Sequence, residues 1–72
     1  MEIDKQLEAQ ALREALGRYP QFAGAGTKLL ARPVYNGVTF IVEFADANAR
    51  TDPDAWEFQN AVVNGYKRLA GL

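Results

Sequence analysis

Apolar residues recur every three or four positions over the first 19 residues of the chain. They are Ile3, Leu7, Ala11, Leu12, Ala15, Leu16 and Tyr19. This spacing predicts an amphipathic helix with one apolar stripe. Acidic Glu2 and Asp4 near its start and basic Arg18 near its end suit the helix dipole. Pro20 is expected to stop the helix, because the residue before a proline is disfavoured in the helical region.

The segment "TDPDAWEFQNAVVNGYKRLAGL" predicts a second helix. Asp52 is its expected N-cap, with Pro53 at the first helical position. Gly65 costs about 1 kcal/mol relative to alanine inside a helix, so we expect the first helix to approach it closely. Trp56 is expected to close the core near the helix start. The main apolar face comprises Ala55, Phe58, Val62, Tyr66 and Leu69, and an adjoining one comprises Trp56, Val63 and Ala70.

Between the helices, two runs rich in β-branched and aromatic residues flank Asn36-Gly37. They cover residues 28–34 and 38–44, and Asn-Gly between such runs is a strong hairpin signal. "QFAGAGTK" before them is expected to be a connector, and "ADANAR" after them a polar loop. The sequence therefore predicts a single small α+β domain over residues 1–72, in the order α-β-β-α. Its two antiparallel helices should pack on one face of the β-hairpin.

Pro33 decides between two registers of the hairpin. A two-residue Asn-Gly turn would pair Tyr35 with Val38 and put Pro33 at a hydrogen-bonded site, where it cannot donate. A three-residue loop ending in a left-handed Gly37 would pair Val34 with Val38. Pro33 would then lie at a non-hydrogen-bonded site, where no donor is needed. We favour the second register. The residues it places on one face are Leu30, Val34, Val38, Phe40, Val42 and Phe44, with the stem of Arg32 among them.

In this register the second strand has an unprotected edge. Pro33 blunts the first strand, whereas "VTFIVEF" carries no proline and one charge. Its outward N–H groups are expected to belong to Thr39, Ile41 and Glu43. Such an edge is covered by its own chain, by a second copy in a homodimer, or by a strand of another protein.

The composition excludes several classes of function. The 72 residues include no His and no Cys, and no Ser either, so the usual general base and nucleophiles are missing and we expect no enzyme. The net charge is −1 and the longest basic run is Lys67-Arg68, which makes nucleic-acid binding unlikely. The acidic, helical N-terminus does not resemble a signal peptide, so a cytoplasmic protein is expected, with no membrane association.

Two motifs suggest ligands but do not fit them. "GAGTK" lacks the Gly-Lys-Ser/Thr order of a phosphate-binding loop and leads into a strand instead of a helix. Acidic and amide side chains in "DANARTDPDAWE" follow EF-hand spacing, but Arg50 would place a cation in the site and Pro53 opens a helix. We therefore expect no cofactor and no metal.

What remains is a small interaction protein that acts by surface recognition, as an adaptor, regulator or inhibitor. A phage or mobile-element origin is compatible with the topology, although topology alone does not imply function. The expected partner-binding residues are Arg32, Tyr35, Thr39, Ile41 and Glu43. One alternative is an assembly subunit that forms a symmetric oligomer through the second strand. Another is a weak nucleic-acid-binding protein with a patch of Arg32, Lys28 and Arg18.

Overall fold

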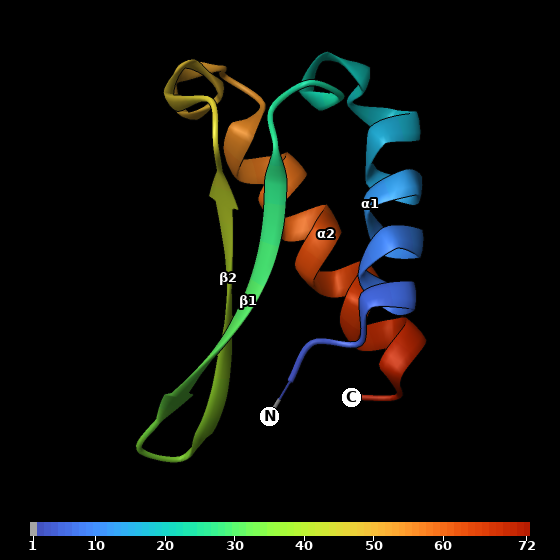
Figure 1. Ribbon diagram of the computed structural model, residues 1–72, viewed down its shortest axis with the longest axis vertical. Helices are drawn as coiled ribbons and strands as arrows, with labels where there is room; N and C mark the ends of the chain where they lie inside the picture. The colour runs from blue at the N-terminus through green and yellow to red at the C-terminus, as the bar shows by residue number, and fades with distance from the viewer. Residues whose placement is uncertain (1) are drawn as a thin grey trace.

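Helix α1 spans Lys5–Arg18 in a computed structural model that describes residues 2–72 (Figure 1). The Asp4 carboxylate accepts the N–H groups of Gln6 and Leu7, at 2.9 and 3.2 Å, and so caps the first turn. Tyr19 is the C-cap, directly before Pro20. The predicted stop at the proline is confirmed.

Helix α2 spans Ala55–Ala70 and runs antiparallel to α1 (Figure 1). The Asp52 carboxylate accepts the N–H of Asp54 at 2.8 Å, so Asp52 caps the turn that leads into the helix. The regular helix begins later than the sequence predicts, and it ends at Gly71, whose φ of 76° is left-handed. Its buried residues are Ala55, Phe58, Val62 and Tyr66, which confirms the main apolar face.

Strands β1 (Thr27–Val34) and β2 (Gly37–Phe44) form an antiparallel hairpin. Val34 pairs with Gly37, so Tyr35 and Asn36 make the turn, and neither register weighed from the sequence is correct. Both turn residues have negative φ, which rules out the type I′ turn that Asn-Gly favours. Gly37 follows the turn with φ of 143°, a conformation that residues with a side chain rarely adopt.

This register turns β1 over relative to our prediction, because a shift of one residue exchanges the two faces of a strand. Leu29 is buried at 1% exposure, whereas Leu30 pairs with Ile41 on the opposite side. The Arg32 side chain also faces away from the helices, opposite Thr39. On β2 the prediction is confirmed, since Phe40, Val42 and Phe44 all pack toward the core.

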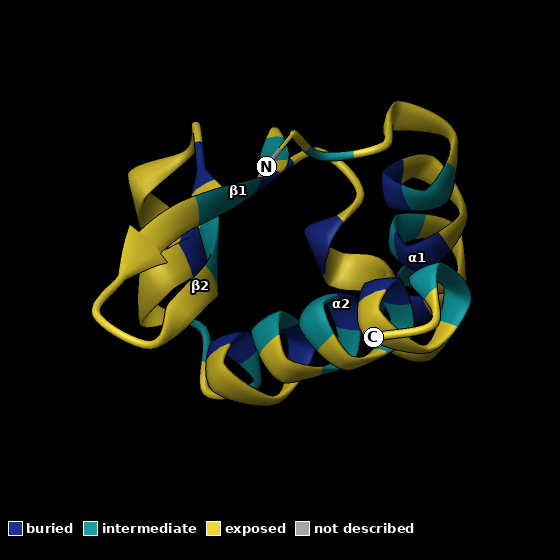
Figure 2. Ribbon diagram, turned by 90° about the horizontal axis from the view of Figure 1, so that it is seen from below, coloured by how far each residue is buried: buried dark blue, intermediate teal, exposed yellow. Residues whose placement is uncertain are grey.

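The core centres on three stacked aromatic rings from separate segments. Phe22 lies 4.4 Å from Phe58 and 5.6 Å from Phe44, measured between ring centroids. Phe22 ends the 3-10 turn η1 (Pro20–Phe22), which the sequence suggested was only a connector. A second 3-10 turn, η2 (Ala47–Thr51), replaces the expected polar loop. Figure 2 shows buried positions on both helices and both strands, while the hairpin tip is exposed throughout.

The two helices approach closely at Gly65, as expected. A Cβ atom on Gly65 would lie 3.6 Å from the Cβ of Ala11 on α1. That distance is ordinary van der Waals contact, so the site brings the helices together without requiring glycine.

Candidate protein interface

The outer edge of β1 is protected by its own chain. In the observed register, the bond from the N–H of Ala45 to the Gly26 carbonyl continues the ladder. The alternation that follows from it directs the backbone of Leu29, Ala31 and Pro33 away from β2. Pro33 has no N–H, and the N–H of Leu29 donates to the Glu8 carboxylate at 2.8 Å. Glu8 on α1 therefore acts together with Pro33 to close much of this edge.

The edge of β2 has no such protection. The same alternation directs the N–H groups of Val38, Phe40 and Val42 away from β1. Among residues 2–72, no side-chain or turn hydrogen bond engages these three groups. Our expectation that Thr39, Ile41 and Glu43 supply the outward groups is wrong, because in this register their N–H groups point to β1. The edge of β2 is unpaired in this chain, but its outward donors belong to Val38, Phe40 and Val42.

The side chains of the expected residues nevertheless gather on one surface. Arg32, Thr39, Ile41 and Glu43 all lie on the sheet face opposite the helices, which we call the open face. Lys28 pairs with Glu43 across the ladder, Leu30 with Ile41, and Arg32 with Thr39. An apolar cross-strand pair thus lies between two polar ones, and the opposite charges of Lys28 and Glu43 face each other. The fifth expected residue, Tyr35, lies apart in the turn and is fully exposed.

Trp56 adds a surface that sequence reasoning assigned to the core. Its side chain is 72% exposed, which corrects that expectation. It lines a groove of about 240 Å³ between α2 and β2, together with Phe40, Val42 and Val63. Position 56 falls outside the three-and-four spacing of the buried face of α2, and this spacing is the signal that could have placed it. The groove borders the backbone of β2 where its edge is unpaired.

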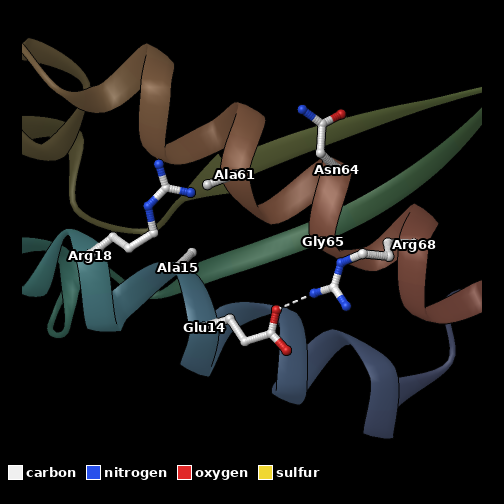
Figure 3. A pocket seen from close by; sticks show the side chains of 7 residues that line it. All are labelled: Glu14, Ala15, Arg18, Ala61, Asn64, Gly65 and Arg68. Atoms are coloured by element: carbon white, nitrogen blue, oxygen red, sulfur yellow. Dashed lines mark hydrogen bonds and ion pairs between the residues drawn. The ribbon is translucent and has the colours of Figure 1, made fainter.

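A second hollow lies between α1 and α2 (Figure 3) and measures about 310 Å³. Its floor consists of small residues, including Ala15 and Gly65, and Arg68 forms an ion pair with Glu14 across it. The Glu14 carboxylate neutralises the charge of Arg68, and the second arginine that lines the hollow is Arg18. Because Arg18 lines this groove between the helices, the structure does not join it to Lys28 and Arg32 in one basic patch.

A polar cluster ties the start of α2 to the end of α1. The Tyr19 hydroxyl donates to the Glu57 carboxylate at 3.0 Å, and Gln21 donates to Asp54 at 2.9 Å. The hydrogen bond to Glu57, with a smaller effect of desolvation, raises the pKa of Tyr19 above its usual value. These contacts hold surface segments together. In the part of the chain that the structure describes, no three His, Cys, Asp or Glu residues are placed to hold a metal ion.

No known protein family, curated protein or solved structure matches this chain detectably. Within residues 2–72, neither helix has the length and apolar character needed to cross a membrane.

Proposed function

We propose that this protein is a non-enzymatic interaction module that recognises an extended polypeptide along the β2 edge. The observation that carries the proposal is the difference between the two edges of its sheet. Glu8 and Pro33 close much of the β1 edge, whereas Phe40 and Val42 present unpaired N–H groups on β2. An added strand would satisfy these groups by β-augmentation.

Two neighbouring surfaces would supply specificity to such a strand. Alternate side chains of the added strand would extend over the open face beside Ile41 and into the groove beside Trp56. An exposed tryptophan next to unpaired backbone is typical of an interaction hot spot. The same proposal includes the regulatory or adaptor role and the cytoplasmic location expected from the sequence.

The test uses amide hydrogen exchange, because it reports on the edge directly. Peptides selected from a displayed random library should slow the exchange of the Phe40 and Val42 amides. The Ala31 amide, on the β1 edge, should be unchanged. Val42→Pro removes one donor from the β2 edge and should abolish peptide binding, whereas Ala31→Pro removes a donor from the other edge and should leave it intact.

The proposal would be overturned if selected peptides protected only amides far from β2. It would also be overturned if no peptide bound and the Phe40 and Val42 amides exchanged as fast as those of an unfolded chain at every protein concentration. The exchange readout on the native chain decides even if a proline variant fails to fold.

A further inference from the structure

We infer that the strand accepted by β2 is the β2 strand of a second copy, paired antiparallel about a twofold axis at Ile41. The product is a four-stranded sheet in the order β1-β2-β2-β1. This inference rests on the proposed function, since it names the occupant of the same edge.

The backbone selects the position of the axis. With the axis at Ile41, Phe40 of one copy lies opposite Val42 of the other, and Val38 lies opposite Phe44. All four residues direct their backbone groups away from β1, so each would occupy a hydrogen-bonded position. An axis at Phe40 would leave Phe44 opposite the turn, and one at Val42 would leave Val38 beyond the end of the strand. The axis at Ile41 pairs the whole edge.

The open face is complementary to itself in this register. Ile41 meets Ile41 of the second copy, with a Leu30 on each outer side, which makes a continuous apolar row across four strands. On either side, Thr39 of one copy lies opposite Glu43 of the other. Each polar row then reads Arg32, Thr39, Glu43, Lys28, with the acid between the two cations and no like charges directly opposite. An axis at Glu43 would instead oppose two carboxylates.

The helix side of the sheet supports the same arrangement. A twofold axis perpendicular to the sheet keeps the helices of both copies on one side of it. Trp56 lies in the groove beside Phe40 and Val42, 72% exposed. The second strand would enter at this groove and cover part of its ring. As the only tryptophan in the chain, Trp56 reports on association by a blue shift of its fluorescence.

Disulfide trapping tests both the partner and the register, because the chain has no cysteine of its own. In a non-hydrogen-bonded antiparallel pair the Cα atoms lie about 4.5 Å apart, within the range of about 4.4–6.8 Å that a disulfide spans. Ile41→Cys should therefore form a covalent dimer nearly completely on mild oxidation. Thr39→Cys alone should not, since its two copies would lie about 14 Å apart along the strands. An equal mixture of Thr39→Cys and Glu43→Cys should give the mixed dimer.

Leu30→Cys is the matched control, since it lies on the same face but on β1, away from the axis. All these positions lie on the open face, outside the core, and circular dichroism should show each variant folded. Light scattering across a wide concentration range should give twice the mass of one chain for the unmodified protein.

Cross-linking of Thr39→Cys alone would overturn the register. A monomeric mass at every concentration, with no cross-linking of Ile41→Cys, would overturn the second copy as the occupant. Peptide protection of Phe40 and Val42 in that monomer would still support the proposed function, so the two failures are distinguishable.

Discussion

The Glu8 carboxylate on α1 accepts the backbone N–H of Leu29 on β1 at 2.8 Å. Glu8 is buried, with 8% of its surface exposed, and Lys5 lies 3.6 Å from its other oxygen. A helix side chain therefore satisfies one outward N–H group of an edge strand. It also joins α1 directly to the hairpin.

Replacing Glu8 with alanine should lower the free energy of unfolding by about 1–3 kcal/mol, because the Leu29 N–H loses its acceptor. Glu8→Gln keeps an acceptor oxygen and should lose less. Chemical denaturation of the two variants and the wild type measures the difference. Equal loss in both variants would mean that the negative charge matters and the hydrogen bond to Leu29 does not.

Gly65→Ala should raise the free energy of unfolding by up to about 1 kcal/mol, the difference in helix propensity between the two residues. The added methyl would lie 3.6 Å from the Ala11 Cβ, a normal contact. Gly26→Ala is the contrasting variant. Its Cβ would lie 2.6 Å from that of Ala45, and its φ is 65°, so it should destabilise. Thermal melts of both variants test the prediction, which fails if Gly65→Ala melts below the wild type.

Asp52→Ala should cost about 1 kcal/mol of stability, because the Asp54 N–H at the entry to α2 loses its side-chain acceptor. Asp52→Asn retains an oxygen in that place and should cost only a few tenths. Urea denaturation compares the two. A loss in the asparagine variant as large as in alanine would show that the charge near the helix start stabilises α2, and not the capping hydrogen bond.

The Tyr19–Glu57 pair should stabilise the fold only while the hydroxyl keeps its proton. Because the hydrogen bond raises the pKa of Tyr19, its contribution is present below about pH 10 and is lost as the pH rises through the raised pKa. Glu57→Gln should lower the pKa of Tyr19 back toward its usual value. Carbon chemical shifts of the Tyr19 ring across the alkaline range measure it, and an unchanged pKa in the variant would assign the shift to desolvation.

Pro33→Val should allow the β1 edge to pair with another strand, because it adds an outward N–H at a position where the chain has none. The average mass in light scattering should then rise above that of the wild type at equal concentration. Ala31→Val is the control, since it adds a similar side chain to the same strand without adding an edge donor. An unchanged mass for Pro33→Val would show that the Glu8 contact alone protects this edge.

The periodic parts of the fold are readable from the sequence. The stripe of α1 and the face of α2 follow helical spacing, and on β2 every second residue, Phe40, Val42 and Phe44, packs toward the core. The register of β1 is not readable, because Leu29 and Leu30 are adjacent and of equal hydrophobicity, so either can face the core. Local turn preference favours Asn36-Gly37 at the tip. The burial of Leu29 and the need to keep Pro33 at a non-hydrogen-bonded site together select Tyr35-Asn36, one residue earlier.

The sequence led to residues that share one surface, but it did not give the backbone geometry of the edge beside them. Four of the five expected residues share the open face, yet for a different reason than expected, since the edge donors are Phe40 and Val42. The Glu8–Leu29 bond joins positions 21 residues apart and has no local signature. Phe22 was missed likewise, because its burial depends on stacking with Phe58 from the other end of the chain.

On the pairing we propose, the protected β1 edge would limit association to two copies. A subunit with two unpaired strand edges can bind a further copy at each end and polymerise into a fibre. A subunit with one unpaired edge can bind only one other copy. The carboxylate of Glu8 and the ring of Pro33 would thus prevent a third strand from pairing with the β1 edge. If β2 pairs with a second copy as we propose, raising the concentration would complete the dimers without lengthening them, and the strand could pair without forming amyloid.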